Sequence, residues 1–241
     1  MENELVTFYS PKSAVSEMFR TLRTNIQFMT TNNNIRLLLI TSSMPGEGKS
    51  WVTANLAVAF AQSGKKVLVI DSDMRRGRQA SIFKKMSDPG LSNIISELNY
   101  DGSEYTEGID GVIQETVVKN LFLISAGAVP PNPSELLVSE KTRELIQELK
   151  QKFDLIILDG TPCSIVTDSV ILSKDADATL IVTAYKKTKA EDLKRIKKEI
   201  ENVGGKVIGV TLNRINTIEK RYQNGYYYYS NNTEITPKKN K

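Results

Sequence analysis

Residues Ile40 to Ala57 read "ITSSMPGEGKSWVTANLA", in which the end of an apolar strand, a glycine-containing loop and an apolar helix follow one another directly. Glycines let such a loop curl so that its N–H groups point inward, and the following helix N-terminus adds positive potential. The loop ends in Lys49 and Ser50, residue types that contact nucleotide phosphates and ligate Mg²⁺. This context predicts a phosphate-binding loop, although Ser43 occupies the position of the first glycine in a generic loop of this kind.

Apolar runs and helical periodicities alternate on both sides of this loop. The predicted strands are residues 37–40, 65–71, 120–125, 153–159, 178–184 and 206–213. The predicted helices are residues 15–26, 49–61, 91–98, 134–152, 167–173 and 189–202. β-Branched strands separated by helices indicate a parallel sheet with helices on both faces. Together with the predicted phosphate-binding loop, this pattern predicts a single α/β domain of the P-loop NTPase type.

The chain divides into a core and two appendages. We expect an N-terminal helix within residues 1–34, the P-loop domain in residues 35–214, and a disordered, tyrosine-rich tail in residues 215–241. The tail contains "YQNGYYYYS" among polar residues that offer its rings no core. By itself, such a segment is also typical of an edge strand or an interface, because tyrosine favours both.

Three carboxylates are predicted to converge on the loop. Asp71 and Asp73 follow one buried strand, and Asp159 ends another. Ligands of open parallel sheets lie beyond the carboxyl ends of the strands, where these acids would meet Lys49 and Ser50. A lone aspartate at such a place is commonly a turn or cap residue, whereas the set suits Mg²⁺, a cation that prefers oxygen ligands.

Composition restricts the remaining possibilities. The net charge of +4 is mild, so nucleic acid is not expected as a partner. No apolar run approaches the ~20 residues of a membrane span, and the N-terminus lacks the features of a signal peptide. The single cysteine, Cys163, excludes an internal disulfide and favours a cytoplasmic location. Histidine is absent, so any catalysis depends on carboxylates, lysine, hydroxyls and bound metal.

Four motifs together resemble the bacterial protein tyrosine kinases of capsular and exopolysaccharide synthesis, which share the deviant Walker A fold of the partitioning ATPases. They are "SSMPGEGKS", similar to the Walker A loop, "VLVIDSDMR", similar to the second aspartate motif, "LIILDGTP", similar to Walker B, and "EMFRTLRTN", similar to an E-x-x-R-x-x-R oligomerisation motif. The segment "PPNPSELL" is also familiar from this family. The resemblance covers nearly the whole chain.

The resemblance implies transfer of phosphate from ATP, with Mg²⁺, to tyrosine. It assigns Asp71 as the proton acceptor, Lys49 as the group that neutralises charge, and Asp73 and Asp159 as groups acting on Mg²⁺ together with Ser50. The nucleotide contacts that it implies are Pro45, Gly46, Glu47, Gly48, Lys49, Ser50, Trp51, Asn213 and Arg214. The division of roles between Asp71 and Asp73 stays open.

The resemblance also gives the tail a function. It implies autophosphorylation at five sites, namely Tyr222, Tyr226, Tyr227, Tyr228 and Tyr229. The length of the tail allows a tyrosine to reach its own site or that of a neighbour, so transfer in cis and in trans both stay open. External substrates are not identified.

Partners are implied in the same way. We expect a homo-oligomeric ring with Glu17, Arg20 and Arg23 at its interface, although a solvated, salt-bridged helix face has the same spacing. We also expect a membrane-anchored activator, the polysaccharide co-polymerase, that recruits the cytoplasmic chain to the inner face of the membrane through its own cytoplasmic tail. A cognate phosphotyrosine phosphatase would reverse the modification.

Two departures from the family pattern and three alternatives accompany these expectations. Gly160 and Thr161 both precede Pro162, where the family has one residue between aspartate and proline, and Gly77 stands where proline is common. A partitioning-type ATPase would have a signature lysine at the position of Met44. A metal-cluster carrier would need a Cys-x-x-Cys pair. A nucleotide-dependent scaffold that transfers little phosphate stays possible.

Overall fold

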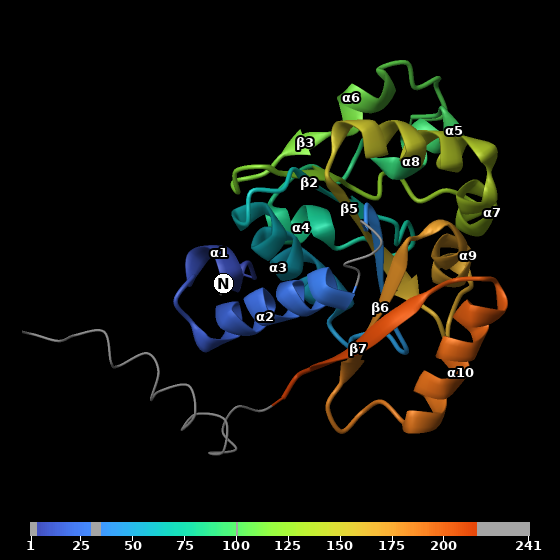
Figure 1. Ribbon diagram of the computed structural model, residues 1–241. Helices are drawn as coiled ribbons and strands as arrows, with labels where there is room; N and C mark the ends of the chain where they lie inside the picture. The colour runs from blue at the N-terminus through green and yellow to red at the C-terminus, as the bar shows by residue number, and fades with distance from the viewer. Residues whose placement is uncertain (1–3, 30–34, 100, 216–241) are drawn as a thin grey trace, which may run out of the picture.

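The structure, a computed structural model, describes residues 4–29, 35–99 and 101–215, in which a seven-stranded sheet forms the centre (Figure 1). The strand order is β3-β4-β2-β5-β1-β6-β7, and every pairing is parallel except the one between β3 and β4. The strands are β1 (Leu37–Ser42), β2 (Val67–Asp71), β3 (Gln114–Glu115), β4 (Leu121–Ile124), β5 (Leu155–Pro162), β6 (Ala178–Ala184) and β7 (Val207–Asn213). The prediction of a P-loop NTPase-like α/β domain is confirmed.

Helices cover both faces of this sheet, as the apolar strands predict (Figure 1). On one face lie α1 (Val6–Tyr9), α2 (Ala14–Met29), α3 (Lys49–Gln62) and α4 (Gln79–Phe83). On the other lie α5 (Leu91–Ser96), α6 (Gly108–Val112), α7 (Pro133–Val138), α8 (Glu140–Lys152), α9 (Asp168–Asp175) and α10 (Ala190–Asn202).

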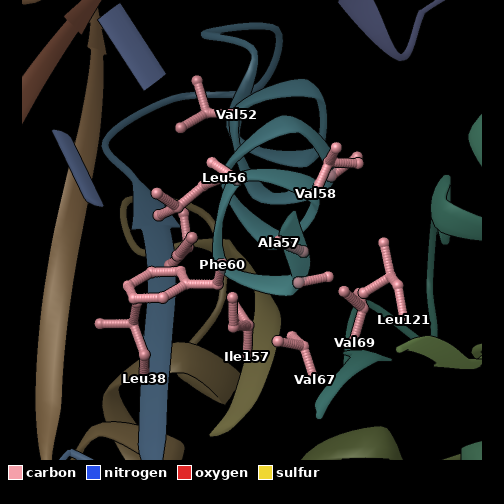
Figure 2. Packing of buried hydrophobic residues seen from close by; sticks show 14 of the residues in the cluster. Leu38, Val52, Leu56, Ala57, Val58, Phe60, Val67, Val69, Leu121 and Ile157 are labelled. Atoms are coloured by element: carbon pink, nitrogen blue, oxygen red, sulfur yellow. The ribbon is translucent and has the colours of Figure 1, made fainter. Parts of the chain in front are cut away.

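The central strands alternate between two cores. Leu38 and Ile40 of β1 face α3, whereas Leu37 and Leu39 face the opposite layer. Figure 2 shows Phe60 and other apolar side chains of α3 lying on the strands. Because β1, β2 and β6 are buried throughout and β5 is buried as far as Thr161, their carboxyl-terminal ends are held in a fixed arrangement.

Helix α2 packs against α3 and is part of the core on the α3 side of the sheet. Phe19 and Ile26 are buried in that core. The Phe19 ring contacts the Trp51 ring edge-on, with 5.3 Å between centroids. Helix α2 therefore contacts the helix that begins at the phosphate loop.

The predicted single helix over residues 134–152 is wrong, because Ser139 divides it into α7 and α8. The Ser139 backbone is extended, and its hydroxyl accepts a hydrogen bond from the Thr142 N–H. Ser139 is thus the N-cap of α8. No helix within the described ranges is both long and apolar enough to cross a bilayer.

Candidate active site

The topology brings the ends of three neighbouring strands to one edge of the sheet. Strand β5 lies between β2 and β1, and Asp159 pairs with Asp71 on one side and with Ile40 on the other. The phosphate loop leaves β1 at this edge, and α3 begins there with Lys49. The predicted convergence of acids and loop follows from this register.

The phosphate loop is held by a residue of strand β7 and by a residue of the connection between β6 and α10. Glu47 is buried, and its carboxylate accepts a hydrogen bond from the Met44 N–H at 2.8 Å and another from the Thr188 hydroxyl. The Asn213 amide donates to the Glu47 carbonyl at 2.9 Å. Gly48 has a φ of +90°, and a Cβ there would lie 2.1 Å from the Asn213 amide nitrogen. The loop therefore needs glycine at this position.

Lys49 lies between two of the predicted acids. Its ammonium is 3.2 Å from the Asp73 carboxylate and 3.5 Å from that of Asp159. Burial alone would lower the pKa of Lys49, but the charges of Asp159, Asp73 and Asp71 outweigh it and raise that pKa. Lys49 is consequently a fixed positive charge at the base of the loop.

Asp159 has no exposed surface, and its carboxylate is fixed by neutral donors as well as by Lys49. It accepts from the Thr53 hydroxyl at 3.3 Å and from the Gln79 amide at 2.8 Å. The Gln79 amide also donates to the Ser50 carbonyl at 3.0 Å. Thr53 and Gln79 were not among the residues predicted from the sequence. Thr53 follows Lys49 by one helical turn, so its place beside the site could have been predicted from the sequence. The five-residue helix that begins with Gln79 has no detectable periodicity, so Gln79 could not.

Asp71 accepts three backbone hydrogen bonds from the loop that follows it. The donors are the N–H groups of Arg78 at 2.7 Å, Gln79 at 2.8 Å and Asp73 at 3.3 Å. Burial and then the charge of Asp159 raise the pKa of Asp71 to about 7. A carboxylate with a pKa near neutrality can accept a proton from a substrate.

The two departures from the family pattern have local explanations. Strand β5 continues through Thr161 to Pro162. The Ser169 hydroxyl accepts a hydrogen bond from the Thr161 N–H at 2.7 Å. Gly77 lies against Ala126 and Asp71, where a Cβ would approach the Ala126 Cβ to 2.7 Å and an Asp71 carboxylate oxygen to 3.0 Å.

A cavity of about 580 Å³ opens over the phosphate loop. The predicted nucleotide residues that line it are Pro45, Gly46, Gly48, Lys49, Ser50, Trp51 and Arg214. Asp73 lines the cavity as well, whereas Asp71 lines a second cavity of about 240 Å³ that shares Arg75 and Arg76 with the first. Asn213 lines an apolar groove between α2 and β7 that shares Trp51 and Arg214 with the large cavity.

The residues fit a magnesium-bound nucleotide better than a free metal ion. Three carboxylates, Asp71, Asp73 and Asp159, surround the single ammonium of Lys49, which leaves a local excess of negative charge. Within the described parts of the chain, however, no three acidic, histidine or cysteine side chains are grouped to hold a metal ion by themselves. Mg²⁺ commonly uses one or two carboxylates together with substrate phosphates, which suits this arrangement.

The predicted oligomerisation residues have partners within the chain. Arg20 pairs with Glu17 and donates to the Pro11 carbonyl at 2.7 Å, and Arg23 donates to the Ala59 carbonyl of α3 at 3.1 Å. Their role at a subunit interface stays a prediction. The five predicted autophosphorylation sites, Tyr222 and Tyr226–Tyr229, lie outside the described residues.

The fold, the phosphate loop and the three acids together define a P-loop nucleotide-binding domain. Comparison with known proteins supports this class. Residues 35–213 match the family model described as AAA domain. CapB of Staphylococcus aureus is 40% identical over 220 residues, which cover 91% of each protein. The tyrosine-protein kinase YwqD of Bacillus subtilis is 35% identical over 94% of this chain and 92% of its own. The crystal structure of the chimerical protein CapA2B2 superposes with a TM-score of 0.80 at 36% identity, covering 88% of this chain and 90% of that one.

These similarities extend over almost the full length of the chain. It belongs to the bacterial tyrosine-protein kinases.

Proposed function

We propose that the chain is an ATP-dependent protein tyrosine kinase that autophosphorylates its C-terminal tyrosine cluster and regulates the synthesis and export of capsular polysaccharide or exopolysaccharide. The observation that carries this proposal is the position of Lys49 between Asp73 and Asp159 in a phosphate-loop cavity, in a chain whose relative YwqD is named a tyrosine-protein kinase.

The reaction forms a bond between a phenolic oxygen and the γ-phosphorus of ATP. The bond from that phosphorus to the β–γ bridging oxygen breaks, and ADP leaves. The phenol arrives protonated, since its ordinary pKa is ~10. We assign Asp71 as the acceptor of this proton, because burial and the charge of Asp159 raise the pKa of Asp71 to about 7.

Lys49 supplies the fixed positive charge for the transferring phosphoryl group. Its contacts to Asp73 and Asp159 hold the ammonium in place before nucleotide binds, so little reorganisation accompanies transfer. Backbone N–H groups of the loop at Gly46 and Gly48 would bind phosphate oxygens. Trp51, Asn213 and Arg214 would position the nucleoside.

Ser50, Asp73 and Asp159 would hold Mg²⁺, directly or through water. When bound, Mg²⁺ would neutralise charge that develops on the β- and γ-phosphate oxygens. Asp159 already accepts from Thr53 and Gln79, which orients its carboxylate for this role.

We further propose that the chain acts in the cytoplasm as a homo-oligomeric ring, with Glu17, Arg20 and Arg23 at subunit contacts. A membrane-anchored activator would recruit it through a cytoplasmic tail, and a cognate phosphatase would remove the phosphates. Each phosphate adds roughly −1.5 to −2 charges, so modification of the tail would weaken the ring by repulsion.

The test is to incubate the full chain with MgATP, alone and with the activator's tail, and to map phosphate by mass spectrometry. Phosphotyrosine on the tail that disappears in Asp71→Ala and Lys49→Met supports the kinase. Release of free phosphate without phosphotyrosine identifies an ATPase, and ATP binding without either product identifies a scaffold.

A further inference from the structure

Three arginines from one loop line the nucleotide cavity. The segment between β2 and α4 carries Arg75, Arg76 and Arg78 into the cavity that holds Lys49 and Asp73. None of the three is needed to explain binding of ATP by the phosphate loop. They lie on the side of the cavity formed by the segment that follows Asp71.

Acidic partners already engage two of these arginines. The Arg75 guanidinium is 3.1 Å from the Asp168 carboxylate and also donates to Ser134, while that of Arg78 is 3.2 Å from Glu4. Within the described ranges, the exposed Arg76 guanidinium has no such acidic partner. Arg76 thus contributes a positive charge that is available to a ligand.

A backbone hydrogen bond fixes the position of Arg76 beside the site. The Arg76 N–H donates to the Asp73 carboxylate at 2.9 Å, so the residue is tied to an acid that also contacts Lys49. Arg76 lines both the large cavity and the second cavity, which Asp71 lines. Arg76 therefore borders both the cavity over the phosphate loop and the cavity lined by the proposed proton acceptor.

The tail creates an electrostatic problem at these cavities. Because Tyr226–Tyr229 are consecutive, one transfer within this run leaves at least one remaining acceptor directly beside a phosphate. That phosphate would approach Asp71, Asp73 and Asp159 carrying roughly −1.5 to −2 charges. Like charges in a partly buried site repel, so entry of a modified segment is disfavoured unless a cation pairs with it.

We propose that Arg76 binds the phosphate of a tyrosine that is already modified and so directs transfer to a nearby tyrosine of the same tail. The inference rests on the proposed kinase function and specifies its substrate: the preferred acceptor segment already carries a phosphotyrosine. A guanidinium suits this role because it binds phosphate through two parallel hydrogen bonds. The transfer reaction itself is unchanged, and Arg76 acts on substrate selection.

The test follows tails with one, two and more phosphates over time in the full chain, under the conditions used to test the kinase. We expect the second phosphate to be added faster than the first. In Arg76→Gln, the ratio of the second rate to the first should fall about tenfold, as expected for loss of a charge-assisted contact. Arg76→Lys keeps the positive charge but cannot form two parallel hydrogen bonds to a phosphate, so it should give an intermediate ratio.

Arg143→Gln is the matched control. It removes the same charge from an arginine of α8 that pairs with Asp175 and does not line the cavity, and it should keep the original ratio. An unchanged ratio in Arg76→Gln overturns the inference, as does an equal fall in Arg143→Gln or a loss of the first phosphate in Arg76→Gln. A natural tail that gains no phosphate at all overturns the kinase proposal instead.

Discussion

Asp71 connects the chemistry of the site to the stability of the fold. Its pKa is raised from 3.8 to about 7 by burial and by the charge of Asp159. The folded chain therefore keeps a proton at pH values where the unfolded chain has lost it. The free energy of unfolding should decrease as pH rises from about 4 to about 7, and the contribution of Asp71 should level off above that range.

We predict that Asp71→Asn removes this dependence. Urea unfolding of both proteins at pH 5 and pH 8 would measure it. From pH 5 to pH 8, the wild-type chain should lose roughly 1–4 kcal/mol more stability than the variant. Parallel losses in the two proteins would show that the Asp71 carboxyl titrates normally.

Gly77 tests how tightly the loop after β2 is packed. A Cβ at this position would lie 2.7 Å from the Ala126 Cβ and 3.0 Å from Asp71, so the Gly77→Ala variant must displace one of them. We expect a loss of about 1–3 kcal/mol of stability, as for other overpacked sites, together with reduced tail phosphorylation.

The matched control for this change is Gly209→Ala, where the nearest atom to a new Cβ is 4.0 Å away. Thermal unfolding should show little change or a slight gain for Gly209→Ala, because alanine restricts the unfolded chain. Equal stabilities of the two variants would mean that the loop around Gly77 rearranges to accept a Cβ without loss of unfolding free energy.

The break between α7 and α8 depends on Ser139. Its hydroxyl accepts from the Thr142 N–H at 3.3 Å and donates to the Leu136 carbonyl at 2.7 Å. We predict that Ser139→Ala loses about 1 kcal/mol of stability, whereas Ser139→Asn, which retains a capping side chain, loses less. Chemical denaturation would distinguish the two, and equal losses would argue against a capping role.

Long elements with a strong pattern were predictable, and short ones were not. The strand predicted at residues 37–40, which the structure extends to Leu37–Ser42, follows from an apolar run, and helix α3 follows from an apolar segment between Gly48 and Gly64. Apolar periodicity runs through residues 134–152, so the interruption at Ser139 was hidden by the pattern on either side. Helix α4 is five residues long, so Gln79 and its contact with Asp159 depended on tertiary structure that no local pattern encodes.

In the site, too, residues on strongly patterned elements could be predicted, whereas contacts that depend on tertiary structure could not. Asp71 and Asp159 lie at or near the ends of strongly patterned strands, and Lys49 begins the strongly patterned helix α3, so their convergence follows from parallel topology. The contact between Glu47 and Asn213 joins positions far apart in the chain, and only the completed sheet brings them together.

At the scale of the whole molecule, one aromatic pair connects helix α2 to the cavity over the phosphate loop. Helix α2 packs along α3, and Phe19 contacts Trp51, which follows Ser50 and lines the cavity. Trp51 is the only tryptophan in the sequence, so fluorescence excited selectively at tryptophan reports on this position. A change in the packing of α2 should therefore be visible both in stability and in nucleotide binding.

We predict that Phe19→Leu lowers stability by about 1–2 kcal/mol, because it removes an edge-to-face contact and leaves the buried site underfilled. It should also weaken ATP binding several-fold in a titration followed by Trp51 fluorescence, since Trp51 loses the ring that fixes it beside Ser50. Met29→Leu is a conservative change at a position of α2 that is 61% exposed, and it should leave both measurements near wild type. Normal ATP affinity in a destabilised Phe19→Leu protein would show that α2 supports the fold without influencing the cavity.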